Sequence, residues 1–113
     1  MMPRMTAEPD PGAFRPPRFD VAVSEDDGTV VLQLEGELDL VSEPTLTAEL
    51  RQAAGRPVRI ELASLAFMDS TGLRTLLSAA REVQSLSLRG PLQPPVQRLL
   101  ELTQTLTILP FEA

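Results

Sequence analysis

The stretch 66–77 constrains the fold of this chain more than any other. An apolar run ends at Asp69, the polar residues Ser70 and Thr71 follow, and after Gly72 apolar residues recur at helical spacing. This change of spacing indicates the end of a strand, a short turn and the start of a helix. Ser70 is therefore expected in the turn, with its hydroxyl facing solvent.

Two alternating segments near the beginning of the chain predict a hairpin. Residues 19–23 and 29–35 carry apolar side chains at every second position, which is typical of strands with one buried face. They flank residues 25–28, whose Asp-Gly pair is a strong signal for a tight hairpin turn. The sheet should therefore open with an antiparallel pair.

The remaining segments alternate between strand and helix patterns. A helix is expected from a cap at Ser42 to a C-terminal glycine at Gly55, with Pro44 in its first turn. The other expected elements are a third strand from 58, a helix over 73–83, a fourth strand over 85–89, a short helix over 95–102 and a weak fifth strand over 105–109. Helices between strands act as crossovers, so the later strands should be parallel and the fold α/β with a mixed sheet of about four to five strands.

The length of 113 residues is enough for one domain with one core. Residues 1–17 are rich in proline and poor in apolar side chains, so a flexible tail is expected before a domain over 18–113. This segment has no apolar region typical of a secretory signal, and no run in the chain is long enough to span a bilayer. We therefore expect a cytoplasmic protein without membrane insertion.

Composition narrows the range of functions. The formal net charge is −6 and the ten basic residues are scattered, so no nucleic-acid partner is expected. The chain has no Cys and no His, which removes thiolate chemistry, the commonest general base and the commonest metal ligand. We expect no catalytic residues, no metal site, no cofactor and no small-molecule ligand.

The polar residues after the third strand have two interpretations. Asp, Ser and Thr are favoured helix caps, and from spacing alone a purely structural cap is the better interpretation. Gly72 weakens it, because glycine in a first helical turn costs up to about 1 kcal/mol relative to alanine. Glycine is tolerated there if a partner must approach the backbone beside an exposed hydroxyl, or if the turn needs a positive φ.

Three segments carry a family resemblance. Residues 67–73 (Phe-Met-Asp-Ser-Thr-Gly-Leu) resemble the phosphorylation motif of the STAS-domain anti-sigma factor antagonists, also called anti-anti-sigma factors. Residues 34–39 resemble the Gly-Glu-Leu-Asp segment of that family, and residues 94–103 resemble its late helix. The order and approximate spacing agree over 18–113. The resemblance implies a single STAS-like domain with helices packed mainly on one face of the sheet.

By this resemblance, Ser70 matches the phospho-acceptor and Thr71 is a minor alternative. Family members bind an anti-sigma factor that is itself a serine kinase with a GHKL-type ATP site. The unphosphorylated antagonist captures this kinase and frees the sigma factor, phosphorylation separates the two, and a PP2C-type phosphatase resets the antagonist. The chain departs from the family pattern at Arg74, where a small residue is common, and at Gln104, where glycine is usual.

The expected partner-binding surface surrounds the motif. It comprises Glu37, Leu38, Asp39, Asp69, Ser70, Thr71, Gly72, Arg74, Thr75 and Ser78. Glu37 and Asp39 could instead cap the first helix, and Leu38 or Leu40 would be the better contact if exposed. STAS domains also serve as accessory subunits of lipid or anion transporters, a role that needs no phosphorylation and remains the alternative function.

Overall fold

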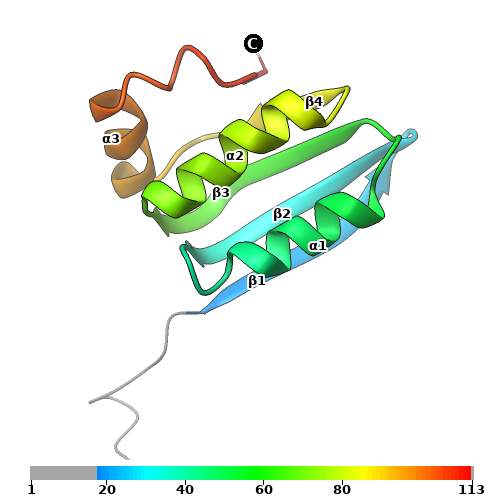
Figure 1. The fold of residues 1–113 in the computed structure, drawn as a ribbon, viewed down its shortest axis with the longest axis horizontal. Coiled ribbons are helices and arrows are strands. Elements are labelled where there is room, and N and C mark those ends of the chain that lie inside the picture. The colour runs from blue at the N-terminus through cyan, green and yellow to red at the C-terminus, as the bar shows by residue number, and fades with distance from the viewer. Residues whose placement is uncertain (1–17, 113) are drawn as a thin grey trace, which may run out of the picture.

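The computed structural model describes residues 18–112; the predicted tail over 1–17 lies outside the described residues. The described chain forms strands and helices in alternating order after an opening pair of strands (Figure 1). Their bounds are β1 Phe19–Asp26, β2 Thr29–Leu38, α1 Glu43–Gln52, β3 Val58–Met68, α2 Ser70–Glu82, β4 Leu86–Arg89 and α3 Pro94–Leu102.

The strands form one mixed sheet in the order β1-β2-β3-β4. β1 and β2 are antiparallel, whereas β2 pairs with β3 and β3 with β4 in parallel. The turn between β1 and β2 places Asp27 at φ 53° and Gly28 at φ 88°, as a two-residue hairpin that follows the strand twist requires. The predicted hairpin and the parallel crossovers are therefore confirmed.

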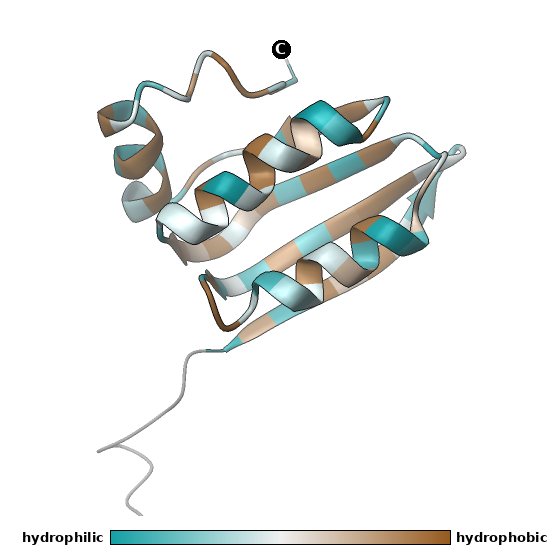
Figure 2. Ribbon diagram, in the orientation of Figure 1, coloured by the Kyte–Doolittle hydropathy of each residue, from teal (hydrophilic) through white to brown (hydrophobic). Residues whose placement is uncertain are grey.

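The helices α1 and α2 lie next to each other over one face of the sheet (Figure 1). Apolar and polar bands alternate along β2 and β3 (Figure 2), so one face of the sheet supplies the core. On the other face Arg59 pairs with Asp26 and Glu61, each at 3.2 Å, and this face is polar. The core side chains that are fully buried include Leu32, Leu34, Leu46, Ile60, Leu62, Leu65, Leu76, Leu88 and Leu100.

The predicted fifth strand over 105–109 is wrong. Gln104 adopts φ 58°, and the N–H of Thr105 donates to the carbonyl of Leu100 at 2.9 Å, so α3 ends in a left-handed turn. The chain continues in turns, and the strand-like pairing after α3 in the described residues is an isolated parallel bridge from Phe111 to β4. The local alternation of Thr and Leu was overridden by the way α3 closes.

Parallel pairing places the candidate site. Leu38 at the end of β2 pairs with Met68 at the end of β3, so the loop after β2 and the turn after β3 emerge side by side. α3 packs against β3 beyond the reach of β4, where Gln93 donates a side-chain hydrogen bond to the carbonyl of Ala63 at 2.9 Å. The carboxyl ends of the two central strands therefore form one surface.

Candidate functional site

The Ser70 turn, residues 69–72, links β3 to α2. Asp69 is the N-cap of α2, and its Oδ1 accepts a hydrogen bond from the N–H of Gly72 at 3.0 Å. The N–H of Asp69 donates to the carbonyl of Leu38 at 3.2 Å, which ties the turn to the end of β2. Ser70 is the first residue of α2 and is exposed, and no hydrogen bond found between described residues uses its hydroxyl. The structural cap is thus Asp69, and the fold does not need the hydroxyl of Ser70.

Gly72 is buried beneath this turn. A Cβ at this position would lie 2.5 Å from the carbonyl oxygen of Leu38 and 2.7 Å from the Cγ of Met68. Its φ is not positive, and its surroundings are internal. Contact between α2 and the end of β2 therefore explains the glycine. The unusual φ expected from the sequence is wrong, whereas close approach of a partner stays a prediction.

Leu38 was expected to contact a partner, but its side chain is fully buried and can contribute to a surface only through its neighbours. Glu37 and Asp39 on either side are half-buried. The Oδ1 of Asp39 accepts hydrogen bonds from the N–H groups of Val41 at 3.0 Å and Ser42 at 3.1 Å. Asp39 therefore shapes the loop before α1.

Ser42 occupies the predicted N-cap position of α1, but its side chain does not cap the helix. Its Oγ donates to the carbonyl of Glu37 at 2.8 Å and accepts from the N–H of Asp39 at 2.8 Å. These bonds fold residues 39–42 into a compact loop. The loop holds two apolar side chains in water, Leu40 with 71% and Val41 with 78% of its surface exposed.

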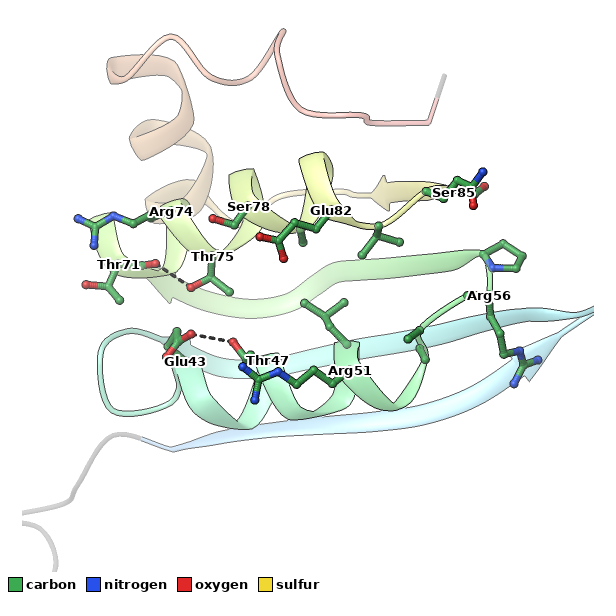
Figure 3. A pocket seen from close by; sticks show the side chains of 18 of the residues that line it. Glu43, Thr47, Arg51, Arg56, Thr71, Arg74, Thr75, Ser78, Glu82 and Ser85 are labelled. Carbon is green, nitrogen blue, oxygen red and sulfur yellow. Dashed lines mark hydrogen bonds between the residues drawn. The ribbon is translucent and has the colours of Figure 1, made fainter.

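A groove of about 950 Å³ lies between α1 and α2 (Figure 3). Its α2 wall includes Thr71, Arg74, Thr75 and Ser78, all of them predicted from the sequence as site residues. Leu40 lines the end of the groove nearest the Ser70 turn. The structure thus brings the predicted face of α2 and the exposed loop together around one depression.

The α1 wall of the groove was missed in the sequence. Glu43, Thr47 and Arg51 line it, and they recur at i, i+4 and i+8 on one face of the helix. That polar stripe was a readable signal, because the apolar residues of α1 follow the same period on the other side. Val41 was also missed. The only signal for it in the sequence was a pair of adjacent apolar residues before a helix that has proline in its first turn.

Some polar side chains of the groove already have hydrogen-bond or ion-pair partners within the protein, and others do not. Thr47 donates its hydroxyl to the Oε2 of Glu43 at 2.7 Å, and Thr75 donates to the carbonyl of Thr71 at 3.0 Å (Figure 3). Arg56 at the far end pairs with Glu25 at 2.7 Å, and this hydrogen bond holds the pKa of the Glu25 carboxyl below its ordinary 4.5.

Arg51 and Arg74 differ from Arg56, because neither has a carboxylate within 4 Å among the described residues. Two cations on the groove are thus available to a ligand or a partner. Within residues 18–112, no group of three or more His, Cys, Asp or Glu side chains could hold a metal ion. No helix in the same part of the chain is long and apolar enough to cross a membrane.

Comparison with known proteins adds a family and a fold. The family model described as "Mlab, STAS domain" matches residues 21–110. An anti-sigma factor antagonist from Mycobacterium paratuberculosis superposes with a TM-score of 0.75 at 23% identity, covering 83% of this chain and 85% of the other. The unphosphorylated form of the anti-sigma factor antagonist SpoIIAA superposes with a TM-score of 0.63 at 24% identity, covering 85% and 89%. No curated protein matches the chain. At these identities the two superpositions establish a shared fold.

Proposed function

The chain belongs to the STAS-domain family, and on that premise we propose that it is an anti-sigma factor antagonist that works by partner switching. With Ser70 unmodified, it binds an anti-sigma factor that is also a GHKL-type serine kinase, and the sigma factor is released. The kinase transfers the γ-phosphoryl group of ATP to the Oγ of Ser70, ADP leaves, and the hydroxyl proton passes to solvent or to a base of the kinase. The complex then separates, and a PP2C-type phosphatase restores the serine. The protein itself acts in the cytoplasm as a binding module and not as an enzyme.

The exposed hydroxyl of Ser70 carries this proposal. The turn is held by Asp69, by main-chain groups and by the packing of Gly72, so Ser70 can be bare or esterified without loss of these contacts. Thr71 is half-buried and faces the groove, which makes it the poorer acceptor. A modifiable group that the fold does not use, beside a groove, suits a switch.

The groove and its loop would form the docking surface. Leu40 and Val41 supply exposed apolar area, and Arg74, Thr75 and Ser78 supply polar contacts along α2. Apolar side chains surrounded by polar groups are the usual composition of a protein interface. Glu37 and Asp39 contribute by holding the loop in shape, and Leu38 and Gly72 do so from beneath the surface.

Phosphorylation would act mainly on this interface. A phosphate adds about −1.5 to −2 charges and must lose water when a partner covers it. A penalty of about 3 to 4 kcal/mol would weaken binding about 140- to 700-fold, at about 1.4 kcal/mol per tenfold.

The test uses the full chain with its candidate anti-sigma kinases and ATP. Phosphate should map to Ser70 by mass spectrometry. Ser70→Ala should stay folded and bind the kinase constitutively, whereas Ser70→Asp should bind poorly. Ser24 on the exposed strand β1 offers a matched control, because Ser24→Asp adds the same charge away from the groove and should bind like the wild type. Equal binding of wild type and Ser70→Asp would contradict the switch.

A second candidate is favoured by the description of the matching family model, which names Mlab. STAS domains, which this chain resembles, also serve as accessory subunits of lipid or anion transporters. In that role the serine needs no phosphate. Stable co-purification with a transporter ATPase, without modification of Ser70, would select this function. Phosphate confined to Ser70 would select the antagonist.

A further inference from the structure

We propose that Arg74 is an internal partner for a phosphate on Ser70, so that modification holds the Arg74 side chain at the start of α2 and away from a partner in the groove. This inference rests on the proposed function, because it concerns the phosphorylated state of the same serine. It assigns to Arg74 a role that its place on the groove wall alone would not indicate.

The spacing of the two residues on α2 is the first observation that supports this pairing. Ser70 and Arg74 are four residues apart on one helix, and such pairs are neighbours on the helix surface, with about 5–6 Å between their Cβ atoms. Helical side chains lean toward the N-terminus of their helix, so an arginine at i+4 reaches back over the residue at i. Figure 3 shows the guanidinium of Arg74 directed toward the end where α2 begins. Both residues are exposed, so no packed group has to move for the two to meet.

The charges around the Ser70 turn are the second observation that supports this pairing. The acidic groups at this end are Asp69 in the turn, Asp39 in the loop before α1, Glu43 at the start of α1 and Glu37, the next-to-last residue of β2. Each of them would oppose a phosphate dianion.

Arg74 is the only basic residue in the first three turns of α2, and it has no carboxylate within 4 Å among the described residues. A planar guanidinium forms paired hydrogen bonds with phosphate oxygens. The cation is therefore uncommitted before phosphorylation and suited to the group that phosphorylation adds.

The consequence is a switch with two parts. Phosphorylation adds negative charge at the rim of the groove and removes a cation from the groove wall at the same time. A partner that places an acidic side chain against Arg74 would lose that contact as well as meeting the phosphate.

The second ionisation of the phosphate reports this pairing directly. Phosphoserine is introduced at position 70 of the full chain by genetic encoding, which needs no kinase, and is titrated by ³¹P NMR. A cation that pairs with the dianion lowers its pKa, so Arg74→Gln should raise the second pKa of the phosphate by about 0.2–0.4 unit. Arg74→Lys, which keeps a charge, should recover part of the wild-type value.

Arg81→Gln is the matched control. Arg81 lies on the same helix and is exposed, but it is about 16 Å from Ser70 along the helix axis, beyond the screening length at physiological salt. Its removal should leave the phosphate pKa unchanged. Identical titrations of wild type and Arg74→Gln, or equal shifts in Arg74→Gln and Arg81→Gln, would overturn the pairing. If no kinase modifies Ser70, the proposed function fails, while this titration still decides the pairing.

Discussion

Replacing Gly72 by alanine sets two physical effects of opposite sign against each other. Helix propensity favours alanine by up to about 1 kcal/mol. The added Cβ, however, would lie 2.5 Å from the carbonyl oxygen of Leu38 and 2.9 Å from its Cγ. That oxygen is held in place because it accepts the N–H of Asp69 at 3.2 Å, so the clash cannot be relieved by turning a flexible side chain. Overpacking of this kind costs about 1–3 kcal/mol, and more when main chain must move.

We therefore expect Gly72→Ala to lower the free energy of unfolding by about 1–3 kcal/mol, which corresponds to about 5–20 °C in Tm for a domain of this size. The chain has no Trp and no Tyr, so urea and thermal unfolding are best followed by far-ultraviolet circular dichroism. Ser78→Ala is the matched control, because it raises helix propensity on the same helix at a half-exposed position and should be neutral or slightly stabilising.

The result that would refute this reasoning is a Gly72→Ala protein as stable as the wild type or more stable. It would mean that propensity outweighs the contact with Leu38. Such a protein that also failed to bind its partner would restore the explanation in which the glycine serves close approach of that partner.

Three further predictions test other parts of the molecule. Gln104→Gly should raise the free energy of unfolding by about 0.5–1 kcal/mol in urea titrations, because the residue after the α3 cap has φ 58°; an unchanged or lower value would argue against strain there. Leu40→Ser combined with Val41→Ser should weaken partner binding at least tenfold in calorimetry with an unchanged Tm, since both side chains are exposed; full affinity would exclude the loop from the interface. Hydrogen bonds from Ser87 and Arg89 lower the pKa of Glu112, so this carboxylate contributes stability that is present above its unfolded value near 4.5 and is lost as pH falls through the folded value. Glu112→Gln should flatten the decline of Tm below that pH, and an unaltered decline would contradict the assignment.

The fold was largely predictable because its signals are local. The Asp-Gly pair sets the hairpin, and the change of spacing after β3 marks the start of α2, as the structure confirms. The segment 105–109 shows where local signals end. Its alternation is strand-like, but the residues just before it close α3 with a left-handed turn, and Thr105 is buried against the end of that helix. Whether such a segment forms a strand or continues the turn at the helix end depends on its packing against the rest of the domain. The sequence of the segment alone does not show that packing.

The two walls of the groove differed in how far their residues were predicted from the sequence. The polar face of α2 could be read from helical spacing, and the equivalent stripe on α1 was equally readable although it was missed. The burial of Leu38 and the need for glycine at Gly72 could not be predicted from the sequence. Both result from one contact between residues that are 34 positions apart in the sequence. Both lie in motif segments, and a motif does not tell which of its residues face inward.

The turn after β3 can serve the core and carry the proposed switch because the two tasks use different atoms. The carboxylate of Asp69 caps α2, and the main chain of Asp69 and the close packing of Gly72 hold α2 to the end of β2, whereas the side chain of Ser70 is exposed. A phosphate there gains about 0.3–1 kcal/mol from the helix dipole and loses a similar amount to the screened repulsion of Asp69, so its effect on folding is near zero. The desolvation cost at a docked interface is several times larger. Phosphorylation should therefore change what the domain binds while leaving its stability within about 1 kcal/mol of the bare form.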